Sequence, residues 1–345
     1  MSAVSKIIDH GTIFGTASCL IILAHGPDRL RDALIRIISK TPFDTRYHSS
    51  LKWILGLGFV WALNRRLNAW ALNNWQLRSG PKWKWDEEVA VVTGGSNGIG
   101  ALTVAGLAAK GIKVAVMDIS SLPEELQKLS NVKYFKCNIA VKEEVDATAD
   151  AIRTTFGHPS ILLNNAGIAD AHTILESTPQ YLRKLFDVNV LSNFYTLQAF
   201  LPHMVQVNKG HVVTTASMAS FVSCPGLVDY SATKAGVLAL HEGLTSELKH
   251  RYKAPHVRTS SVHPIFVSTK LVDTFADSLG KSKAVVISPQ TVANAIVKQV
   301  LSGQSGQVVL PGWMAAAQSA RGWPNWMQEL MRDGTKNDVL PAPST

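Results

Sequence analysis

Between Glu87 and Leu310 the chain alternates short apolar runs with longer segments in which apolar residues recur every three or four positions. The short runs are rich in β-branched residues and predict strands, whereas the longer spacing predicts helices. Strands that alternate with helices predict an α/β fold with a doubly wound, parallel sheet. The seven predicted strands are Val89–Thr93, Ile112–Met117, Val132–Phe135, Ile161–Leu163, His211–Thr215, Val257–Val262 and Gln307–Leu310. The predicted helices are Ile99–Lys110, Val141–Phe156, Pro179–Met204, Tyr230–Leu248 and Pro289–Leu301.

The N-terminal residues 1–85 have a different pattern. Residues 11–27 contain no Asp, Glu, Lys or Arg, and residues 53–63 form a second, shorter apolar stretch. A helix that spans a bilayer needs about 20 apolar residues, so the first stretch is marginal and the second is too short to cross alone. Between Val60 and Trp75 apolar residues recur at helical spacing, as in a helix that lies in a membrane interface. We therefore predict a helical membrane-associated segment; the alternative is a cap of soluble helices packed on the following domain.

The basic charge of the chain is concentrated in this same segment. Residues 1–85 contain twelve Lys and Arg and four Asp, whereas the remaining 260 residues contain 22 basic and 21 acidic groups. Six of the nine tryptophans lie between Trp53 and Trp85, interleaved with these charges. This mixture favours an anionic membrane surface as partner, and the nearly neutral remainder argues against a nucleic-acid-binding role. Three scattered cysteines are too few for a disulfide framework or a zinc site, so no metal is expected.

A glycine-rich loop follows the first predicted strand and precedes the first predicted helix. It comprises Thr93, Gly94, Gly95, Ser96, Asn97, Gly98, Ile99 and Gly100. Glycines here allow positive φ and close approach of the backbone to a phosphate at the helix N-terminus, as in Rossmann-type folds. Asp118 ends the second strand, where a carboxylate hydrogen-bonds ribose hydroxyls and repels a 2′-phosphate. Because no Lys or Arg occurs in the loop or beside Asp118, the sequence favours NAD(H) over NADP(H).

Tyr230 and Lys234 lie four residues apart on a predicted helix, so both side chains project from one face. A phenol has a reference pKa of about 10, and a neighbouring ammonium together with a positive nicotinamide ring favours the phenolate. We therefore expect Lys234 to tune Tyr230 for proton transfer and to bind the nicotinamide ribose. Ser217 follows the fifth predicted strand, 13 residues before Tyr230, where its hydroxyl is expected to hydrogen-bond the substrate oxygen.

These residues resemble the motifs of the short-chain dehydrogenase/reductase family in order and approximate spacing. The resemblance covers residues 87–312 and depends on four motifs. They are Thr93–Gly100, Asn164–Gly167, Ser217, and Tyr230 with Lys234. The resemblance implies an oxidoreductase that transfers hydride between a nicotinamide cofactor and an alcohol or carbonyl compound, with Tyr230 as general acid/base.

The resemblance also assigns roles to several asparagines. Asn189 looks like the family's helix asparagine, which holds a water that relays protons from the lysine. The turn that contains Asn165, Ala166 and Gly167 looks like the one beside the adenine ring. The family usually has Asp after the third strand, in contact with the adenine amino group. Here Asn138 takes that place, and its amide oxygen is expected to accept the same hydrogen bond.

A second departure follows the sixth predicted strand, where many members have Pro-Gly and this chain has Pro264-Ile265. The run from Pro264 to Thr269 looks instead like the retinol dehydrogenase and 17β-hydroxysteroid dehydrogenase branch, whose members carry an N-terminal membrane anchor. In that comparison Pro264, Val267 and Thr269 contact the cofactor, Thr269 at the nicotinamide carboxamide. The following residues, 271–284, are where the family closes over its substrate, and their apolar side chains form either a lipid pocket or simple helix packing.

We therefore divide the chain into three regions: a membrane-associated segment (1–85), a catalytic domain (86–312) and an amphipathic tail (313–345) that forms an interfacial or a core-packing helix. The expected substrate is a lipophilic alcohol or carbonyl compound of retinoid, steroid or long-chain type. The expected location is the endoplasmic reticulum membrane or a lipid droplet, with the catalytic domain in the cytosol. Residues 179–204 and 230–248 resemble helices that pair subunits in this family, which predicts a homodimer. Two alternatives stay open: an NADPH-linked ketone reductase of lipid synthesis, and a non-catalytic NAD(H)-binding scaffold on a membrane or lipid droplet.

Overall fold

The computed structural model describes residues 48–76, 80–282 and 284–340. The chain divides into two compact units, residues 1–75 and residues 76–345. The apolar stretch 11–27, predicted to associate with a membrane, lies outside the described residues.

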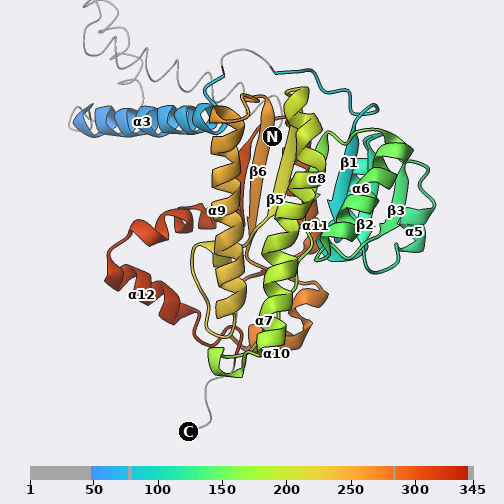
Figure 1. Cartoon of the computed structure of the whole chain (residues 1–345). Coiled ribbons are helices and arrows are strands. Elements are labelled where there is room, and N and C mark those ends of the chain that lie inside the picture. The colour runs from blue at the N-terminus through green and yellow to red at the C-terminus, as the bar shows by residue number, and fades with distance from the viewer. Residues whose placement is uncertain (1–47, 77–79, 283, 341–345) are drawn as a thin grey trace, which may run out of the picture. The chain divides into compact units, whose positions relative to one another are not determined.

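The smaller unit contains helix α3 (His48–Leu72), which includes most of the segment predicted as an interfacial helix (Figure 1). Several of its large apolar side chains are exposed, among them Val60, Trp61 and Trp70. The Arg65 guanidinium lies 4.8 Å from the centre of the Trp61 ring, one helical turn away, as a cation–π pair. Within the described residues, no helix is both long enough and apolar enough to cross a membrane.

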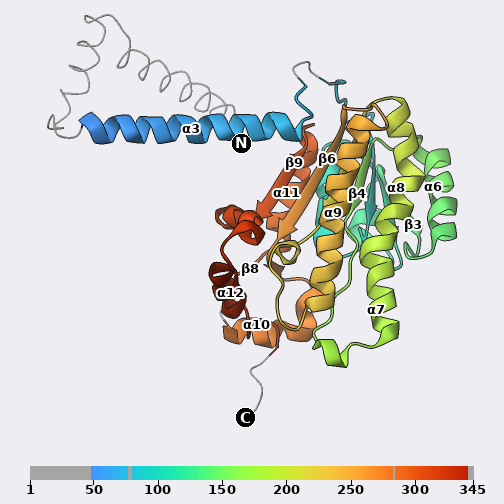
Figure 2. The same ribbon diagram turned by 60° about the vertical axis from the view of Figure 1, so that its left-hand side comes forward.

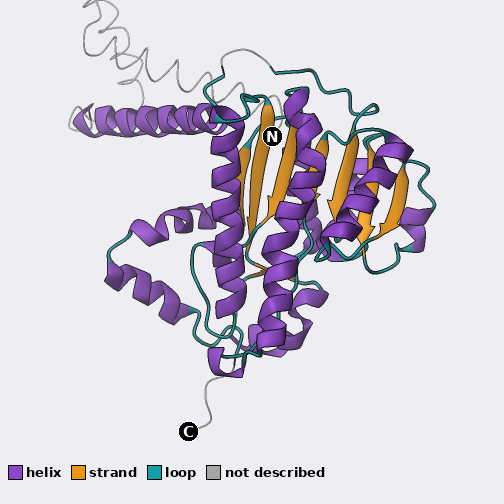
Figure 3. Cartoon of the chain, viewed as in Figure 1, coloured by secondary structure: helices purple, strands orange, loops and turns teal. Residues whose placement is uncertain are grey.

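The larger unit is built on a seven-stranded parallel sheet, which confirms the predicted α/β fold. Its strands are β1 (Val89–Thr93), β2 (Lys113–Asp118), β3 (Val132–Lys136), β4 (Ile161–Asn164), β5 (Gly210–Thr215), β6 (Val257–Pro264) and β9 (Gly306–Leu310). Their order is β3-β2-β1-β4-β5-β6-β9, so the chain starts in the middle and winds first to one edge and then to the other. Because every pair is parallel, all strands end at the same edge of the sheet (Figure 3).

Helices cover both faces of this sheet (Figure 1). One face packs against α4 (Gly98–Ala108), α5 (Glu124–Gln127) and α11 (Pro289–Leu301), the other against α6 (Lys142–Phe156), α8 (Ser192–Gln206) and α9 (Val228–His250). Successive residues of β1 alternate between the two cores: Ala90 and Val92 pack with α4 and α11, and Val91 packs with α6 and α8. A strand buried on both faces needs apolar residues at every position, which is why β1 is a continuous apolar run.

The long helix predicted over residues 179–204 contains an irregular turn. It consists of α7 (Pro179–Phe186), a π-helical turn (Asp187–Leu191) and α8. Asn189 lies in this wide turn and is fully buried. π-helical turns inside α-helices often occur at functional sites, and the contacts of Asn189 described below account for this one.

The residues that link β6 to α11 and those that follow β9 contribute to the carboxyl edge of the main sheet. Two short strands, β7 (Phe266–Val267) and β8 (Val286–Ile287), pair in parallel. Between them lie a 3₁₀ helix (Lys270–Phe275) and α10 (Ala276–Ser282), so the predicted closing segment is largely helical. After β9 the chain forms a second 3₁₀ helix (Gly312–Gly322) and α12 (Asn325–Gly334), as Figure 2 shows.

Strand β6 is buried along its whole length although five of its eight residues are polar. The polar side chains have partners from neighbouring elements. Ser260 Oγ lies 2.9 Å from His211 Nε2 and accepts a hydrogen bond from Gln299, and the hydroxyl of Thr259 pairs with that of Thr245 at 2.8 Å. The interior of this region therefore depends on hydrogen bonds as well as on apolar packing.

Three buried histidines, His211, His241 and His263, make the stability of the domain sensitive to acid. Burial lowers the pKa of His211 to about 3, and the pKa values of His241 and His263 to about 4. Below about pH 6.5 the unfolded chain therefore binds more protons than the folded chain, and the free energy of unfolding falls. Each histidine contributes to this decrease over most of the range down to about pH 4.

We expect the urea midpoint of unfolding to fall steeply as the pH decreases from 6.5 to 4. His241→Gln should make this dependence shallower, because one titrating group is removed, whereas the same change at the exposed His250 should leave it as in wild type. Urea titrations at several pH values measure the slope. A midpoint that does not change with pH over this range would contradict the burial of neutral histidines.

Candidate active site

A cavity of about 690 Å³ lies at the carboxyl edge of the sheet, where doubly wound folds bind their ligands. Loops after β1 to β6 contribute to its lining. Most of the predicted site residues line it. They are Gly94, Asn97, Gly98, Ile99, Asp118, Asn138, Asn165, Ala166, Gly167, Ser217, Tyr230, Lys234, Pro264, Val267 and Thr269. Three others, Ser96, Gly100 and Asn189, are buried behind the lining.

The glycine loop has a backbone that other residues could not easily adopt. Gly94 has a φ of +64°, and a Cβ atom there would lie 2.8 Å from the Cα atom of Ala166. A Cβ atom on Gly100 would lie only 2.0 Å from the carbonyl oxygen of Gly94. Asn97 precedes α4 but makes no side-chain capping hydrogen bond, so the first turn of α4 has no side-chain cap at the cavity. This arrangement fits a phosphate group at the helix N-terminus.

Asp118 connects the glycine loop to the loop after β2. Its Oδ2 atom accepts the backbone N–H of Ser96 and its Oδ1 atom accepts that of Ser120, both at 2.9 Å. Each carboxylate oxygen can accept a further hydrogen bond, so the residue can still bind ribose hydroxyls. The basic residues that line the cavity are Lys184, Lys234 and Lys270, and none belongs to the loops after β2 and β3.

The turn after β4 is bonded directly to the glycine loop. Asn165 Nδ2 donates to the carbonyl oxygens of Thr93 and Gly94, at 3.3 and 3.2 Å. The hydroxyl of Thr93 accepts the backbone N–H groups of Asn165 and Ala166, at 3.1 and 3.2 Å. The side chain of Asn165 therefore supports the glycine loop, a role that the sequence did not indicate.

Tyr230 and Lys234 project from α9 into the cavity, and Ser217 lies at the end of β5. Lys234 Nζ lies 5.6 Å from the centre of the Tyr230 ring and donates to the carbonyl oxygen of Thr215 at 2.9 Å. Burial raises the pKa of Tyr230 to about 12, while a hydrogen bond from Ser217 acts in the opposite direction. Burial lowers the pKa of Lys234 to about 8. Desolvation, and not the lysine charge, is thus the largest influence on the phenol in the protein alone.

Asn189 uses its side chain to hold the loop that follows β4. Its Oδ1 atom accepts the backbone N–H of Ile168, and its Nδ2 atom donates to the carbonyl oxygen of the same residue, both at 2.9 Å. A Cβ atom on Gly167 would lie 3.4 Å from Asn189 Oδ1 and 3.4 Å from Lys234 Nζ. The glycine therefore leaves room between the asparagine and the lysine, which is where the predicted proton-relaying water would have to bind.

Three further contacts hold the turn that contains Ser217 and Ser220. His263 Nδ1 lies 3.1 Å from the Ser217 carbonyl oxygen and donates to it, because a carbonyl can only accept. Ser220, in the same turn, donates through its hydroxyl to the Lys234 carbonyl oxygen at 2.9 Å. Arg321 donates to the Ser220 carbonyl oxygen, also at 2.9 Å. No local sequence pattern indicates the Arg321 contact, which spans 101 residues.

The rest of the lining is mostly apolar and includes the C-terminal region. Its apolar side chains include Ala169, Val222, Leu227, Ile265, Phe266, Leu271, Val272, Phe275, Met314, Ala317 and Met331. The last three follow β9. Helix α12 thus directs Met331 to the cavity, whereas Trp326 and Leu330 are each 64% exposed. The tail therefore contributes to packing and also leaves an apolar face exposed.

Comparisons with known proteins found one matching family model and several similar proteins. Residues 88–279 match a family model described as short chain dehydrogenase. The dehydrogenase RED2 of Cochliobolus heterostrophus is 42% identical over 201 residues, which cover 58% of this chain and 75% of that protein. Estradiol 17-beta-dehydrogenase 11 of Homo sapiens is 32% identical over 234 residues, 66% of this chain and 76% of that protein. Retinol dehydrogenase 10 of Rattus norvegicus is 36% identical over 157 residues, 45% of this chain and 46% of that protein.

Solved structures share the fold at lower sequence identity. The 3-ketoacyl-(acyl-carrier-protein) reductase from Brucella melitensis, complexed with NADH, matches with a TM-score of 0.59 and 22% identity, over 66% of this chain and 98% of that chain. A short-chain type dehydrogenase/reductase from Mycobacterium marinum matches with a TM-score of 0.60 and 24% identity, over 66% of this chain and 95% of that chain. These similarities establish the fold of the domain.

Gly94→Ala tests the role of the glycine loop. We expect it to weaken NADH binding by about tenfold or more, because the added Cβ atom meets Ala166 and the positive φ is unfavourable for alanine. Fluorescence titration with NADH measures the dissociation constant. Gly243→Ala is the control, since no atom lies within 4 Å of a Cβ added there, and NADH affinity should stay unchanged. Equal affinities in the two variants would contradict the assignment of the loop.

Proposed function

The chain belongs to the short chain dehydrogenase family of NAD(P)-dependent oxidoreductases, and we propose that it uses NAD(H) to interconvert a lipophilic alcohol and its ketone or aldehyde. One observation carries this proposal: Ser217, Tyr230 and Lys234 line the same cavity as the glycine loop. Hydride transfer to or from a carbonyl carbon needs a group beside it that donates or accepts a proton. We propose that Tyr230 is that group.

The residues of the cavity fit a nicotinamide dinucleotide. The glycine loop would hold the pyrophosphate at the N-terminus of α4, and Asp118 would bind the adenosine ribose. Asn138 and the turn after β4 would lie at the adenine end, and Thr269 with Lys234 would bind the nicotinamide end. When bound, the cofactor donates or accepts the hydride.

Tyr230 exchanges a proton with the substrate oxygen in this mechanism. Because burial holds the pKa of Tyr230 at about 12, the phenol is protonated at neutral pH and suited to donate a proton to a carbonyl oxygen. It acts as a base for alcohol oxidation only where positive charge favours the phenolate, as the Lys234 ammonium and an oxidised nicotinamide ring do. Ser217 hydrogen-bonds the substrate oxygen, and Asn189 with a water and Lys234 returns the proton.

The preference for NAD(H) is supported by the charges near Asp118. The residues that follow it, from Ile119 to Ser121, are uncharged, and Ile119 and Ser120 line the cavity. A 2′-phosphate placed beside Asp118 would therefore meet a carboxylate and no cation from the loops after β2 and β3.

A lipophilic substrate is supported by the apolar walls contributed by the segments after β6 and after β9. An apolar pocket with a few polar groups favours a ligand that has a large apolar body and one reactive oxygen. Two relatives are named as an estradiol dehydrogenase and a retinol dehydrogenase, and both of these names refer to lipophilic alcohols. We propose a retinoid, a steroid or a long-chain alcohol.

We also propose that the protein acts at the endoplasmic reticulum membrane or a lipid droplet, with the catalytic domain in the cytosol. The basic, tryptophan-rich residues 1–85 and the exposed apolar side chains of α3 support a membrane surface as partner. A homodimer is supported by apolar side chains that α7, α8 and the turn between them leave exposed, such as Phe186, Leu191 and Phe194.

Tyr230→Phe tests the proposed reaction. We expect turnover to fall by about 10² to 10⁴-fold, because the proton donor is lost, while the dissociation constant for NADH stays nearly unchanged. All-trans-retinol, estradiol and dodecan-1-ol with NAD⁺, and the matching carbonyl compounds with NADH, are assayed with detergent-solubilised protein by NADH absorbance. The control Tyr252→Phe changes an exposed tyrosine at the end of α9 and should keep full activity. Wild-type turnover in the Tyr230 variant would refute the mechanism.

Ile119→Arg tests the cofactor preference. For the wild type we expect kcat/KM with NADH to exceed that with NADPH by about tenfold or more. Ile119 is 67% exposed and follows Asp118, so an arginine there should attract the 2′-phosphate and shift the ratio towards NADPH. Ile119→Gln controls for the loss of the apolar side chain and should leave the ratio unchanged. A wild-type preference for NADPH would contradict the proposal.

A further inference from the structure

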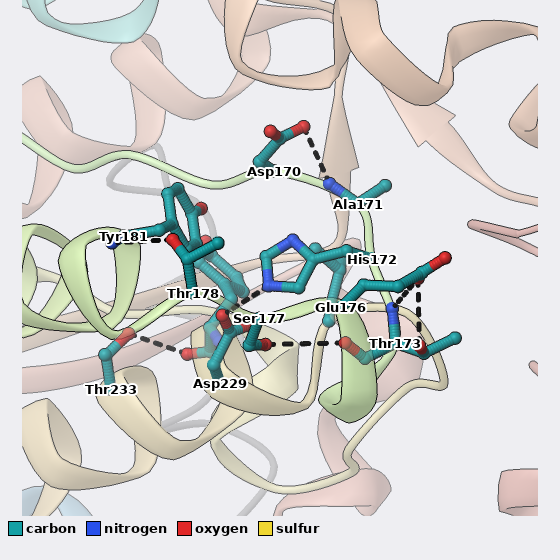
Figure 4. A network of polar contacts seen from close by, with 12 residues as sticks. Asp170, Ala171, His172, Thr173, Glu176, Ser177, Thr178, Tyr181, Asp229 and Thr233 are labelled. Atoms are coloured by element: carbon teal, nitrogen blue, oxygen red, sulfur yellow. Dashed lines mark hydrogen bonds and ion pairs between the residues drawn. The ribbon is translucent and has the colours of Figure 1, made fainter.

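A histidine–aspartate contact joins two segments beside the cavity that are far apart in the sequence. His172 lies in the loop after β4, and Asp229 is the second residue of α9. His172 Nε2 lies 2.9 Å from Asp229 Oδ2, and the two side chains are only 15% and 9% exposed (Figure 4). Neither side chain lines the cavity or takes part in the proton transfer described above.

Asp229 uses its two carboxylate oxygens for different partners. Oδ1 accepts the backbone N–H of Tyr230 at 2.7 Å, while Oδ2 faces His172. The N–H groups of a first helical turn have no partner within the helix, and a carboxylate there also interacts favourably with the helix dipole. A carboxylate this buried needs such partners, because an unpaired buried charge is costly. One carboxylate thus connects the loop to the backbone of the catalytic tyrosine.

Two further contacts hold His172, one through its backbone and one through its ring. Its backbone N–H donates to the carbonyl oxygen of Gly226 at 3.0 Å, in the turn before α9. The Tyr181 ring, from α7, meets the imidazole edge to face, with ring centres 4.9 Å apart and planes at 87° (Figure 4). These contacts fix both the loop position and the plane of the ring, so that Nε2 points at Asp229.

The joined segments form part of the cavity wall around the tyrosine. Ala169, from the loop, and Leu227, from the turn, both line the cavity. Together with Ala171 they pack in one apolar cluster that includes Tyr230. A loop that separated from the turn would therefore open the wall next to the phenol.

Lys234 does not depend on this contact. Its ammonium is held by the carbonyl oxygen of Thr215, from β5. A displacement of the first turn of α9 would therefore move the Tyr230 phenol relative to the lysine instead of moving both together. Small changes in such a spacing are known to cost a large part of the rate.

We propose that His172 and Asp229 form a latch that positions the Tyr230 phenol and the adjoining substrate wall, an inference that rests on the proposed function for the reaction it affects. Both are positioning residues: they act through the backbone of Tyr230 and through Ala169. The latch is specific to this pair, because the nearby Glu176 carboxylate is bonded to the backbone N–H and hydroxyl of Thr173, at 2.7 and 2.8 Å.

The test compares five variants of the full-length protein with wild type. His172→Ala and Asp229→Ala each remove one side of the latch, and the double variant removes both. His172→Gln keeps an amide N–H group that can donate to Asp229 and serves as the conservative rescue. Glu176→Gln is the matched control, since it removes a carboxylate from the same loop but not from the latch.

Hydrogen exchange tests the latch without any turnover. We expect Asp229→Ala to speed exchange at the Tyr230 amide, which loses its acceptor, and both alanine variants to speed exchange across residues 168–172. Glu176→Gln should leave the Tyr230 amide at the wild-type rate. If the Tyr230 amide exchanges at the wild-type rate in Asp229→Ala, the latch proposal is overturned, whatever the activity of the protein.

Kinetics test the consequence, with all-trans-retinol, estradiol and dodecan-1-ol as substrates. We expect kcat to fall by about tenfold to a hundredfold in each alanine variant and to recover in His172→Gln, with NADH affinity as in wild type. The double variant should be no less active than Asp229→Ala alone, because Asp229→Ala already removes the contact with His172 as well as the hydrogen bond from the Tyr230 N–H. Faster exchange with unchanged kcat would overturn the positioning role and leave only a structural contact. If wild type converts none of the three alcohols, the proposed function fails, and the exchange result alone decides the latch.

Discussion

Thr93 and Gly94, at the end of β1, lie so close to the turn after β4 that a side chain on Gly94 would meet the Cα atom of Ala166. The amide of Asn165 bonds both of their carbonyl oxygens and also accepts the hydroxyl of Thr215 at 3.4 Å. The Thr215 carbonyl oxygen in turn holds the Lys234 ammonium. The glycine loop and the lysine are therefore connected through one asparagine and one threonine. This short connection holds the glycine loop and the Lys234 ammonium at a fixed spacing, on which the proposed reaction would depend.

Burial is the main influence on the protonation of Tyr230 and Lys234. Tyr230 keeps its proton because its anion would be poorly solvated, and the pKa of Lys234 falls to about 8 because its cation is also desolvated. The resting site thus contains a neutral phenol beside an ammonium that is bonded to the backbone. In the proposed reaction a neutral phenol can donate a proton, whereas accepting one requires positive charge nearby that favours the phenolate. The same desolvation keeps His263 neutral, so that it can hold the Ser217 carbonyl oxygen without placing a second cation near Lys234.

The apolar side of the cavity is built by segments that do not belong to the main sheet. The residues after β6 and the C-terminal region contribute Phe275, Met314 and Met331, so the wall can change while the sheet stays the same. α12 places Met331 in that wall and leaves Trp326 exposed. An apolar cavity wall and an exposed aromatic face on one short helix suit a substrate that is dissolved in lipid, in agreement with the proposed function.

The sheet and the glycine loop could be predicted from patterns along the chain. Strands such as β1 and β4 could be predicted because strands buried on both faces are continuous apolar runs, and the glycine loop could be predicted because positive φ and close contacts leave few other residues possible. The Tyr230–Lys234 pair followed from its helical spacing and from the resemblance to a family. The folded structure was needed to show which distant residues meet: Asp229 with His172, Ser220 with Arg321, and Met331 with the cavity. It also showed that Asn189 lies in a π-helical turn and that β6 is buried although it is largely polar. Periodicity and motifs report on neighbours within one element, whereas these contacts depend on how separate elements pack, which no local pattern encodes.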